Sequence, residues 1–234
     1  MINEYKYKVK LGYNTFKLLV QDEKVMYNEE HKKVNGYIDA DMGEIVIGTK
    51  EWTCNDEILQ TVIHECLHGI TYDRNISNIL VERDIEFLGN MLYSVIKDNG
   101  HIFKLMFDLH LLRKNFMYME GETPSEFEKK HIKIGYKDYL IQIIDKVIDE
   151  EGNNNTCCIK HSEGIIQLRK NPNKYNLLVY LWQSILYGIC EFGVYTFNKE
   201  ENMNNAIVTD LALGLTNFIV DNPKLIAFNE TILF

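Results

Sequence analysis

Residues 61–68 contain two histidines four positions apart, and a glutamate directly follows the first of them. On an α-helix, side chains four positions apart lie on one face, so His64 and His68 can direct ring nitrogens at one metal ion. Glu65 would then lie about 100° further round the helix, beside the ion, where a general base for an activated water belongs. The pattern predicts a zinc site with His64 and His68 as ligands and Glu65 as the catalytic base.

The sequence around this motif has the period of an amphipathic helix. Apolar residues recur at the spacing that places them on one face, namely Leu59, Val62, Ile63, Cys66, Leu67 and Ile70. We therefore expect a helix over roughly residues 55–72 that buries this face. The alternative interpretation is that His64 and His68 are ordinary solvated or capping histidines.

The third ligand must come from elsewhere, because a catalytic zinc site usually takes three protein ligands and leaves one position open. A second helix is expected over roughly residues 77–97, and it carries Glu82 and Glu86 one turn apart beside an apolar seam. Gly89 lies about one turn further along and would permit a close approach between the two helices. The alternative for both glutamates is a solvated acidic face.

Together with Glu82 and Glu86, the motif resembles the glutamate-type zinc metallopeptidases, the gluzincins or thermolysin-like enzymes. The resemblance implies that Glu82 is the third ligand and that Glu86 is a carboxylate that holds a zinc histidine in place. The spacing from His68 to Glu82 is short for that family. Glu86, or a distant histidine such as His101 or His110, therefore remains an alternative third ligand.

The first half also resembles a small family of bacteriophage and prophage proteins regarded as metallopeptidases. The segments that carry this resemblance are residues 37–39, 61–68 and 92–99. It covers nearly all of the first half, and it implies a minimal zincin-like unit that is phage- or prophage-encoded.

The sequence pattern occurs twice. Short segments of the first half return about 120 positions later in the same order. The matched pairs are 9–13 with 132–136, 43–47 with 163–167, and 92–99 with 215–222. We expect two tandem repeats, with a first domain over residues 1–112, a linker over 113–130 and a second domain over 131–234. The alternative is two unrelated domains with similar patterning.

Each half is expected to fold as strands followed by two helices, which indicates the α+β class, with a small antiparallel sheet in each repeat. In the first half the strands are expected over residues 5–11, 16–20, 36–39 and 44–48. The motif helix aligns with residues 182–189, where Gln183, Ser184 and Tyr187 replace His64, Glu65 and His68. The second repeat is therefore expected to be a degenerate, metal-free pseudo-domain that packs with the first.

Composition limits the other functions. The chain has 234 residues, 46% hydrophobic and 25% charged, with a formal net charge of −9, which suits a globular protein and argues against nucleic-acid binding. It has no apolar run of membrane-spanning length and no hydrophobic signal region, so we expect no membrane partner. A cytoplasmic location is expected, in the bacterial host if the protein is phage-encoded, and five cysteines without a disulfide framework agree with this.

These expectations combine into a zinc metallopeptidase that hydrolyses a peptide or protein substrate. Glu65 would take a proton from the attacking water, and Tyr72 and Tyr93 are candidates for a second donor to the oxyanion. An extended substrate could pair with a sheet edge such as residues 44–48. The alternatives are a hydrolase acting on another substrate, or a binding module, vestigial or structured by zinc, that holds a host or phage protein.

Overall fold

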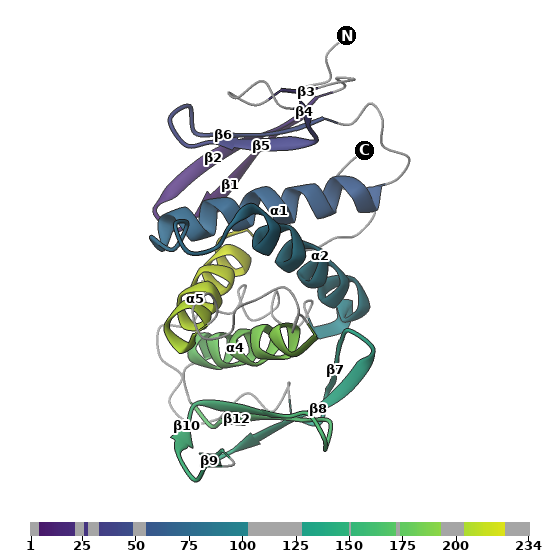
Figure 1. Ribbon diagram of the computed structural model, residues 1–234, viewed down its shortest axis with the longest axis vertical. Helices are drawn as coiled ribbons and strands as arrows, with labels where there is room; N and C mark the ends of the chain where they lie inside the picture. Colours follow the sequence, from purple (N-terminus) through teal and green to yellow (C-terminus); the bar gives the residue numbers. More distant parts are fainter. Residues whose placement is uncertain are drawn as a thin grey trace. The chain divides into compact units, whose positions relative to one another are not determined.

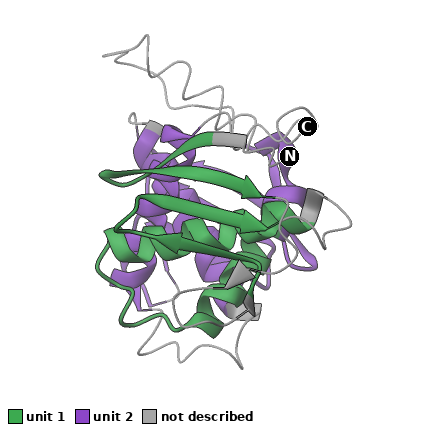
Figure 2. Cartoon of the chain, turned by 90° about the horizontal axis from the view of Figure 1, so that it is seen from above, with its two compact units in different colours: residues 1–93, 228–234 green, residues 94–227 purple. Residues whose placement is uncertain are grey.

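The computed structural model describes residues 5–21, 26–27, 33–48, 55–102, 128–149, 151–171, 174–192 and 204–222. The chain forms two compact units, and the boundary falls after Tyr93, so that Ser94 begins the second unit (Figure 2). Each unit combines a four-stranded sheet with helices, which confirms the expected α+β class (Figure 1). The linker expected over residues 113–130 lies almost wholly outside the described residues.

The sheet of the first unit has the strand order β1-β2-β6-β5. Its strands are β1 (Tyr5–Leu11), β2 (Asn14–Gln21), β5 (Gly36–Asp39) and β6 (Glu44–Gly48). Two short strands, β3 (Met26–Tyr27) and β4 (Lys33–Val34), pair as a separate hairpin. The expected antiparallel sheet is wrong in one respect, because β6 pairs with β2 in parallel. The hairpin β5–β6 returns with β6 between β2 and β5, which makes the sheet mixed.

Strand β6 is an inner strand of the sheet, and its burial explains its continuous apolar sequence. Ile45 and Ile47 are fully buried in the core, while Val46 on the opposite face packs with Leu19 in a smaller cluster. A strand that is covered on both faces needs apolar residues at every position. The expectation that a substrate pairs with residues 44–48 is therefore wrong, because β2 and β5 already occupy both edges of β6.

Helix α1 (Asn55–Asp73) lies along one face of this sheet (Figure 1). Helix α2 (Glu82–Asp98) begins later than the expected start near residue 77. The N–H of Val81 donates to the Asp84 carboxylate at 3.2 Å, and the N–H of Asp84 donates to the Val81 carbonyl at 2.8 Å. This reciprocal capping fixes the first turn, so that Glu82 is the first residue of α2.

The second unit repeats the architecture of the first. Its strands are β7 (His131–Ile134), β8 (Lys137–Ile144), β11 (Cys157–Lys160) and β12 (Ile165–Arg169), in the order β7-β8-β12-β11. A separate hairpin is formed by β9 (Val147–Ile148) and β10 (Asn154–Asn155), and the helices are α4 (Lys174–Phe192) and α5 (Asn205–Asp221). No helix in the described part of the chain is long and apolar enough to cross a membrane.

The two sheets also share their register. Leu11 pairs with Asn14 as Ile134 pairs with Lys137, at hairpin turns where Gly12 and Gly135 have φ of 60° and 61°. The parallel pairs correspond in the same way, Lys17 with Glu44 in the first unit and Leu140 with Ile165 in the second. A tandem duplication predicts this recurrence of strand order and register.

Candidate metal centre

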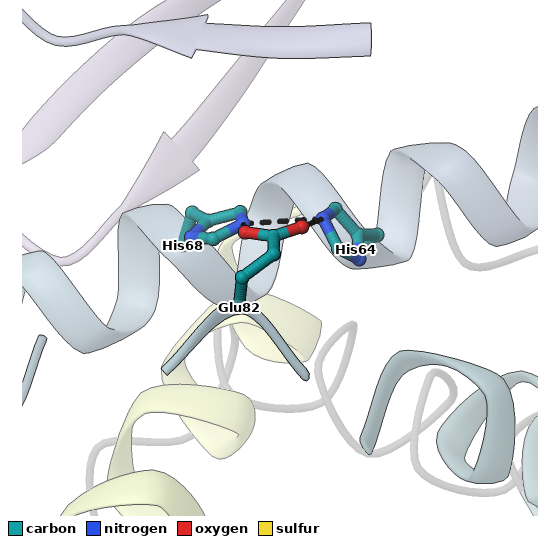
Figure 3. A group of neighbouring side chains, drawn as sticks. All are labelled: His64, His68 and Glu82. Carbon is teal, nitrogen blue, oxygen red and sulfur yellow. Dashed lines mark hydrogen bonds and ion pairs between the residues drawn. The ribbon is translucent and has the colours of Figure 1, made fainter. Parts of the chain in front are cut away.

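His64 and His68 project from the same side of α1, one turn apart, at the border of its buried face (Figure 3). Their neighbours Val62, Ile63 and Leu67 are buried in the core, whereas the two imidazoles remain 21% and 29% exposed. The Nε2 atoms of the two rings lie 3.1 Å apart. The amphipathic pattern thus anchors the helix and leaves both ring nitrogens facing the same point.

Glu82 completes the cluster from the start of α2 (Figure 3). Its Oε1 lies 3.1 Å from Nε2 of His64, and its Oε2 lies 3.1 Å from Nε2 of His68. The short spacing from His68 to Glu82 suffices because α1 ends at Asp73 and tight turns lead directly into α2. The position of Glu82 in the first turn also places its charge at the positive end of the helix dipole.

The donor atoms fit a metal ion in kind and in spacing. Two imidazole nitrogens and one carboxylate form the ligand set of many catalytic zinc sites. Metal–ligand bonds of about 2.0–2.1 Å in a tetrahedral site put neighbouring donors roughly 3.3 Å apart. The three contacts of 3.1 Å, which involve both carboxylate oxygens of Glu82, are close to that value, and one donor atom from each side chain lies within 4.8 Å of the others. His64, His68 and Glu82 could therefore hold a metal ion.

Glu65 is buried beside this cluster, with 5% of its surface exposed. Its carboxylate accepts a hydrogen bond from the backbone N–H of Ile38 on β5. Burial, followed by the nearby charge of Glu82, raises the pKa of Glu65 to about 8, while the Ile38 hydrogen bond opposes the rise. Burial also lowers the pKa of His68, with a further contribution from His64, while Glu82 opposes that change. A cation at this site would favour the ionised form of Glu65.

Strand β5 is an edge strand of the sheet, and it lies alongside α1. Gly36 faces Thr61, the side chain of Ile38 lies against Gly69, and the N–H of Ile38 faces Glu65. The N–H of Gly48 donates to the Asn35 carbonyl at 2.9 Å, and hydrogen-bonded pairs alternate along an antiparallel ladder. The backbone groups of Ile38 therefore face the open edge and the motif helix.

The contact between the two helices includes one expected and one unexpected feature. Gly89 lies against the backbone of His64, where an added Cβ would be 3.6 Å from the Cα of His64. The predicted close approach at Gly89 is thus present. The unexpected feature is a hydrogen bond from the side chain of Gln60 to that of Asn90. Gln60 lies one turn before His64 on the same side of α1, and this four-residue spacing was the feature of the sequence that could have predicted its contact with α2.

The remaining candidates lie outside the cluster of ligand atoms. Glu86 and His101 are exposed, and the three groups that converge are the histidines of the motif and Glu82. Tyr72 lies one turn beyond His68 and is 61% exposed, and Tyr93 is half-buried. His110 lies outside the described residues. The role of Tyr72 or Tyr93 as a second donor to the oxyanion stays a prediction.

Comparison with protein-family models, with curated proteins and with solved structures finds no match for this chain. Its function is therefore inferred from the residues of the site. The geometry brings together His64, His68 and Glu82, and it adds Glu65 and the open edge of β5. The backbone N–H of Ile38, which donates to Glu65, could not be predicted from the metal motif.

Proposed function

We propose that this protein is a zinc-dependent peptidase in which His64, His68 and Glu82 hold the metal and Glu65 is the general base. The observation that carries the proposal is the convergence of three donor groups at 3.1 Å beside a buried carboxylate. A purely structural zinc site usually has four protein ligands, whereas the described residues offer three here, which would leave one position for water. Glu82 is 70% exposed, so the cluster is accessible to solvent through this residue.

A zinc ion held there acidifies water and polarises a carbonyl group. The carboxylate of Glu65 accepts the proton that the attacking water gives up, and it later returns this proton to the leaving amine. The hydrogen bond from Ile38 holds that carboxylate in one orientation. The burial of Glu65 keeps other water molecules away from its carboxylate. Zinc is favoured over magnesium or calcium at this site because two of the donor groups are imidazoles.

An extended peptide is the substrate that best suits the surroundings of Glu65. In the described part of the sheet β5 is an edge strand that lies along α1, and an added strand is a common way to bind a peptide. A peptide paired with β5 would lie beside Glu65, since the N–H of Ile38 already contacts that carboxylate. The substrate edge of this proposal is thus β5 and not the inner strand β6.

The experiment that tests this function measures metal and hydrolysis separately. The purified protein should hold one zinc per chain, and His64→Ala or His68→Ala should remove it. Glu65→Gln should keep zinc and the fold but lose cleavage of a peptide library, because an amide cannot accept the proton. Glu163→Gln, an exposed glutamate of the second unit, serves as the matched control. Unchanged zinc in both histidine variants would contradict the site.

The second candidate function is a binding module that holds a host or phage protein. The neutral residues Gln183 and Tyr187 at the motif positions of the second unit favour it, because one unit of this fold exists without the ligand set. The two functions differ in the role of Glu65, which a binding module does not need. Biological activity that survives Glu65→Gln unchanged would favour the binding module.

A further inference from the structure

The second unit contains a cluster at the position that the metal centre occupies in the first. Helices α1 and α4 both have 19 residues, and α2 and α5 both have 17. Aligned from their first residues, these helices place Gln183, Tyr187 and Asn205 at the positions of the two histidines and Glu82. The three positions of the ligands are therefore occupied by neutral polar side chains.

These side chains link α4 to α5 by hydrogen bonds. The hydroxyl of Tyr187 donates to Oδ1 of Asn205 at 2.8 Å, and Nε2 of Gln183 donates to the hydroxyl of Thr209 at 3.0 Å. The Thr209 hydroxyl in turn donates to the carbonyl of Asn205 at 2.7 Å. Thr209 is the counterpart of Glu86. The positions of His68 and Glu82 thus join the two helices in both units, whereas Gln183 bonds to the counterpart of Glu86 and His64 contacts Glu82.

The substitutions compensate in size. Tyrosine reaches further than histidine, and asparagine is shorter than glutamate, so the pair Tyr187–Asn205 spans the gap that His68 and Glu82 span in the first unit. A small residue is also retained, since Gly89 has the fully buried Ala212 as its counterpart. The framework of the site has therefore been kept while its charge has been removed.

The second cluster has neutral side chains where the first has its imidazoles and carboxylates. Ser184 stands at the position of Glu65, is fully buried, and donates to the Tyr180 carbonyl at 3.0 Å. The Oε1 atom of Gln183 accepts from the Thr156 hydroxyl at 3.4 Å and from the Cys157 thiol at 3.8 Å. Burial raises the pKa of Cys157 to about 11, so without a metal this thiol is a neutral hydrogen-bond donor to Gln183 at neutral pH.

We propose that the hydrogen bonds of Gln183, Tyr187, Asn205 and Thr209 replace a metal ion as the link between α4 and α5. The second unit then keeps the framework of a metal site but holds its helices together without metal. This inference rests on His64, His68 and Glu82 as the metal ligands of the first unit. Two consequences follow, one for the natural protein and one for a variant in which the ligands are restored.

The natural protein is tested by hydrogen exchange on the full chain, with zinc and after chelation. Chelation should accelerate exchange in α1 and in the first turn of α2, while exchange in α4 and α5 stays unchanged. Faster exchange in α4 and α5 after chelation would overturn the inference. Tyr187→Phe should raise exchange at the start of α5 about fivefold with or without zinc, because it removes one hydrogen bond. No change in that variant would also count against the inference.

The restored site is tested with Co²⁺, whose visible absorption reports tetrahedral coordination. The variant Gln183→His, Tyr187→His, Asn205→Glu is made in a His64→Ala, His68→Ala background, so that only the second unit can bind. It should take up one Co²⁺ per chain, whereas the background protein alone should take up none. A folded restored variant that binds no Co²⁺ would overturn the inference. Binding there, with no zinc in the natural protein, would contradict the proposed function and with it the replacement of a metal ion, although the framework of the second unit could still hold one.

Discussion

The backbone N–H of Ile38 donates a hydrogen bond to the carboxylate of Glu65, which connects the edge strand β5 to the motif helix α1. This contact fixes the distance between the proposed base and the strand proposed to bind substrate. It also partly offsets the cost of burying the carboxylate, yet burial prevails and the pKa of Glu65 rises to about 8. The proposed mechanism requires Glu65 as a carboxylate, but without a metal its surroundings favour the protonated carboxylic acid.

The first prediction is that Glu65 destabilises the metal-free protein as pH rises. Because folding raises its pKa from 4.5 to about 8, the stability that Glu65 contributes is fully present below pH 4.5 and is lost as pH rises through 8. The loss is at most about 1.4 kcal/mol for each pH unit. The thermal unfolding midpoint of the metal-free protein should therefore decrease as the pH is raised from 5 to 8. Glu65→Gln should remove the part of this decrease that Glu65 causes.

The comparison between the natural protein and Glu65→Gln isolates this group, because His68 and the surface charges are the same in both. With zinc bound, the cation favours the carboxylate, so the advantage of Glu65→Gln at pH 8 should disappear. Parallel pH profiles of the two metal-free proteins would show that Glu65 is ionised in the folded protein at all these pH values.

The second prediction separates Glu82 from Glu86. Glu82 contacts both histidines at 3.1 Å, so Glu82→Ala should lose zinc to a moderate chelator. Glu86 is exposed, and its counterpart Thr209 accepts a hydrogen bond from the counterpart of His64. Glu86→Ala should therefore weaken zinc binding only about 10- to 100-fold, as the loss of a carboxylate that orients a ligand does. Competition with a fluorescent chelator measures both affinities, and the opposite ranking would move the ligand to Glu86.

The third prediction concerns the helix crossing at Gly89. An added Cβ would lie 3.6 Å from the Cα and Cβ of His64, which is an ordinary contact, and the second unit has Ala212 at this position. Gly89→Ala should stabilise the first unit by roughly 0.5–1 kcal/mol and keep zinc, since alanine is the better helix former. Gly89→Leu should push α2 away from His64 and lower zinc affinity.

Ala212→Gly is the matched control in the second unit, and it should destabilise that unit by a similar amount without changing zinc content. The readouts are thermal unfolding and metal analysis. Loss of zinc in Gly89→Ala would mean that α2 contacts His64 more tightly than the structure indicates.

The sequence contains enough information to predict elements with a strong local period. Strands 36–39 and 44–48 and the motif helix follow from alternation, turn residues and an apolar stripe, and their observed bounds agree closely. The start of α2 does not follow, because residues 77–81 have no feature that excludes a helix. It is set by the capping contact between Val81 and Asp84, which depends on the local backbone.

Pairing between distant strands is the other part that local pattern cannot supply. The parallel pairing of β2 with β6 depends on where a hairpin inserts, and nothing in either strand encodes its partner. The role of Ile38 depends on the same choice, because its N–H faces Glu65 only when β5 is the edge strand. Side chains that carry chemistry were thus predictable from spacing, whereas a backbone group that orients one of them was not.

The last prediction tests the edge strand through Gly36. A Cβ at this position would lie 2.8 Å from Cγ2 of Thr61 and 2.9 Å from Cδ1 of Ile47, with the Val46 carbonyl oxygen at 3.1 Å. Gly36→Ala should therefore move β5 away from α1 and cost about 1–3 kcal/mol of stability.

The proposed metal ligands lie on α1 and α2, so Gly36→Ala should retain zinc, whereas peptide cleavage and the affinity for a peptide should both fall. Gly100→Ala is the control, because no atom of the described residues lies within 4 Å of an added Cβ there, so its stability should not fall and its cleavage should stay unchanged. Metal analysis, thermal unfolding and the kinetics of peptide cleavage distinguish the outcomes. Full cleavage by a destabilised Gly36→Ala protein would show that β5 does not bind the substrate, and it would leave the metal site itself unaffected.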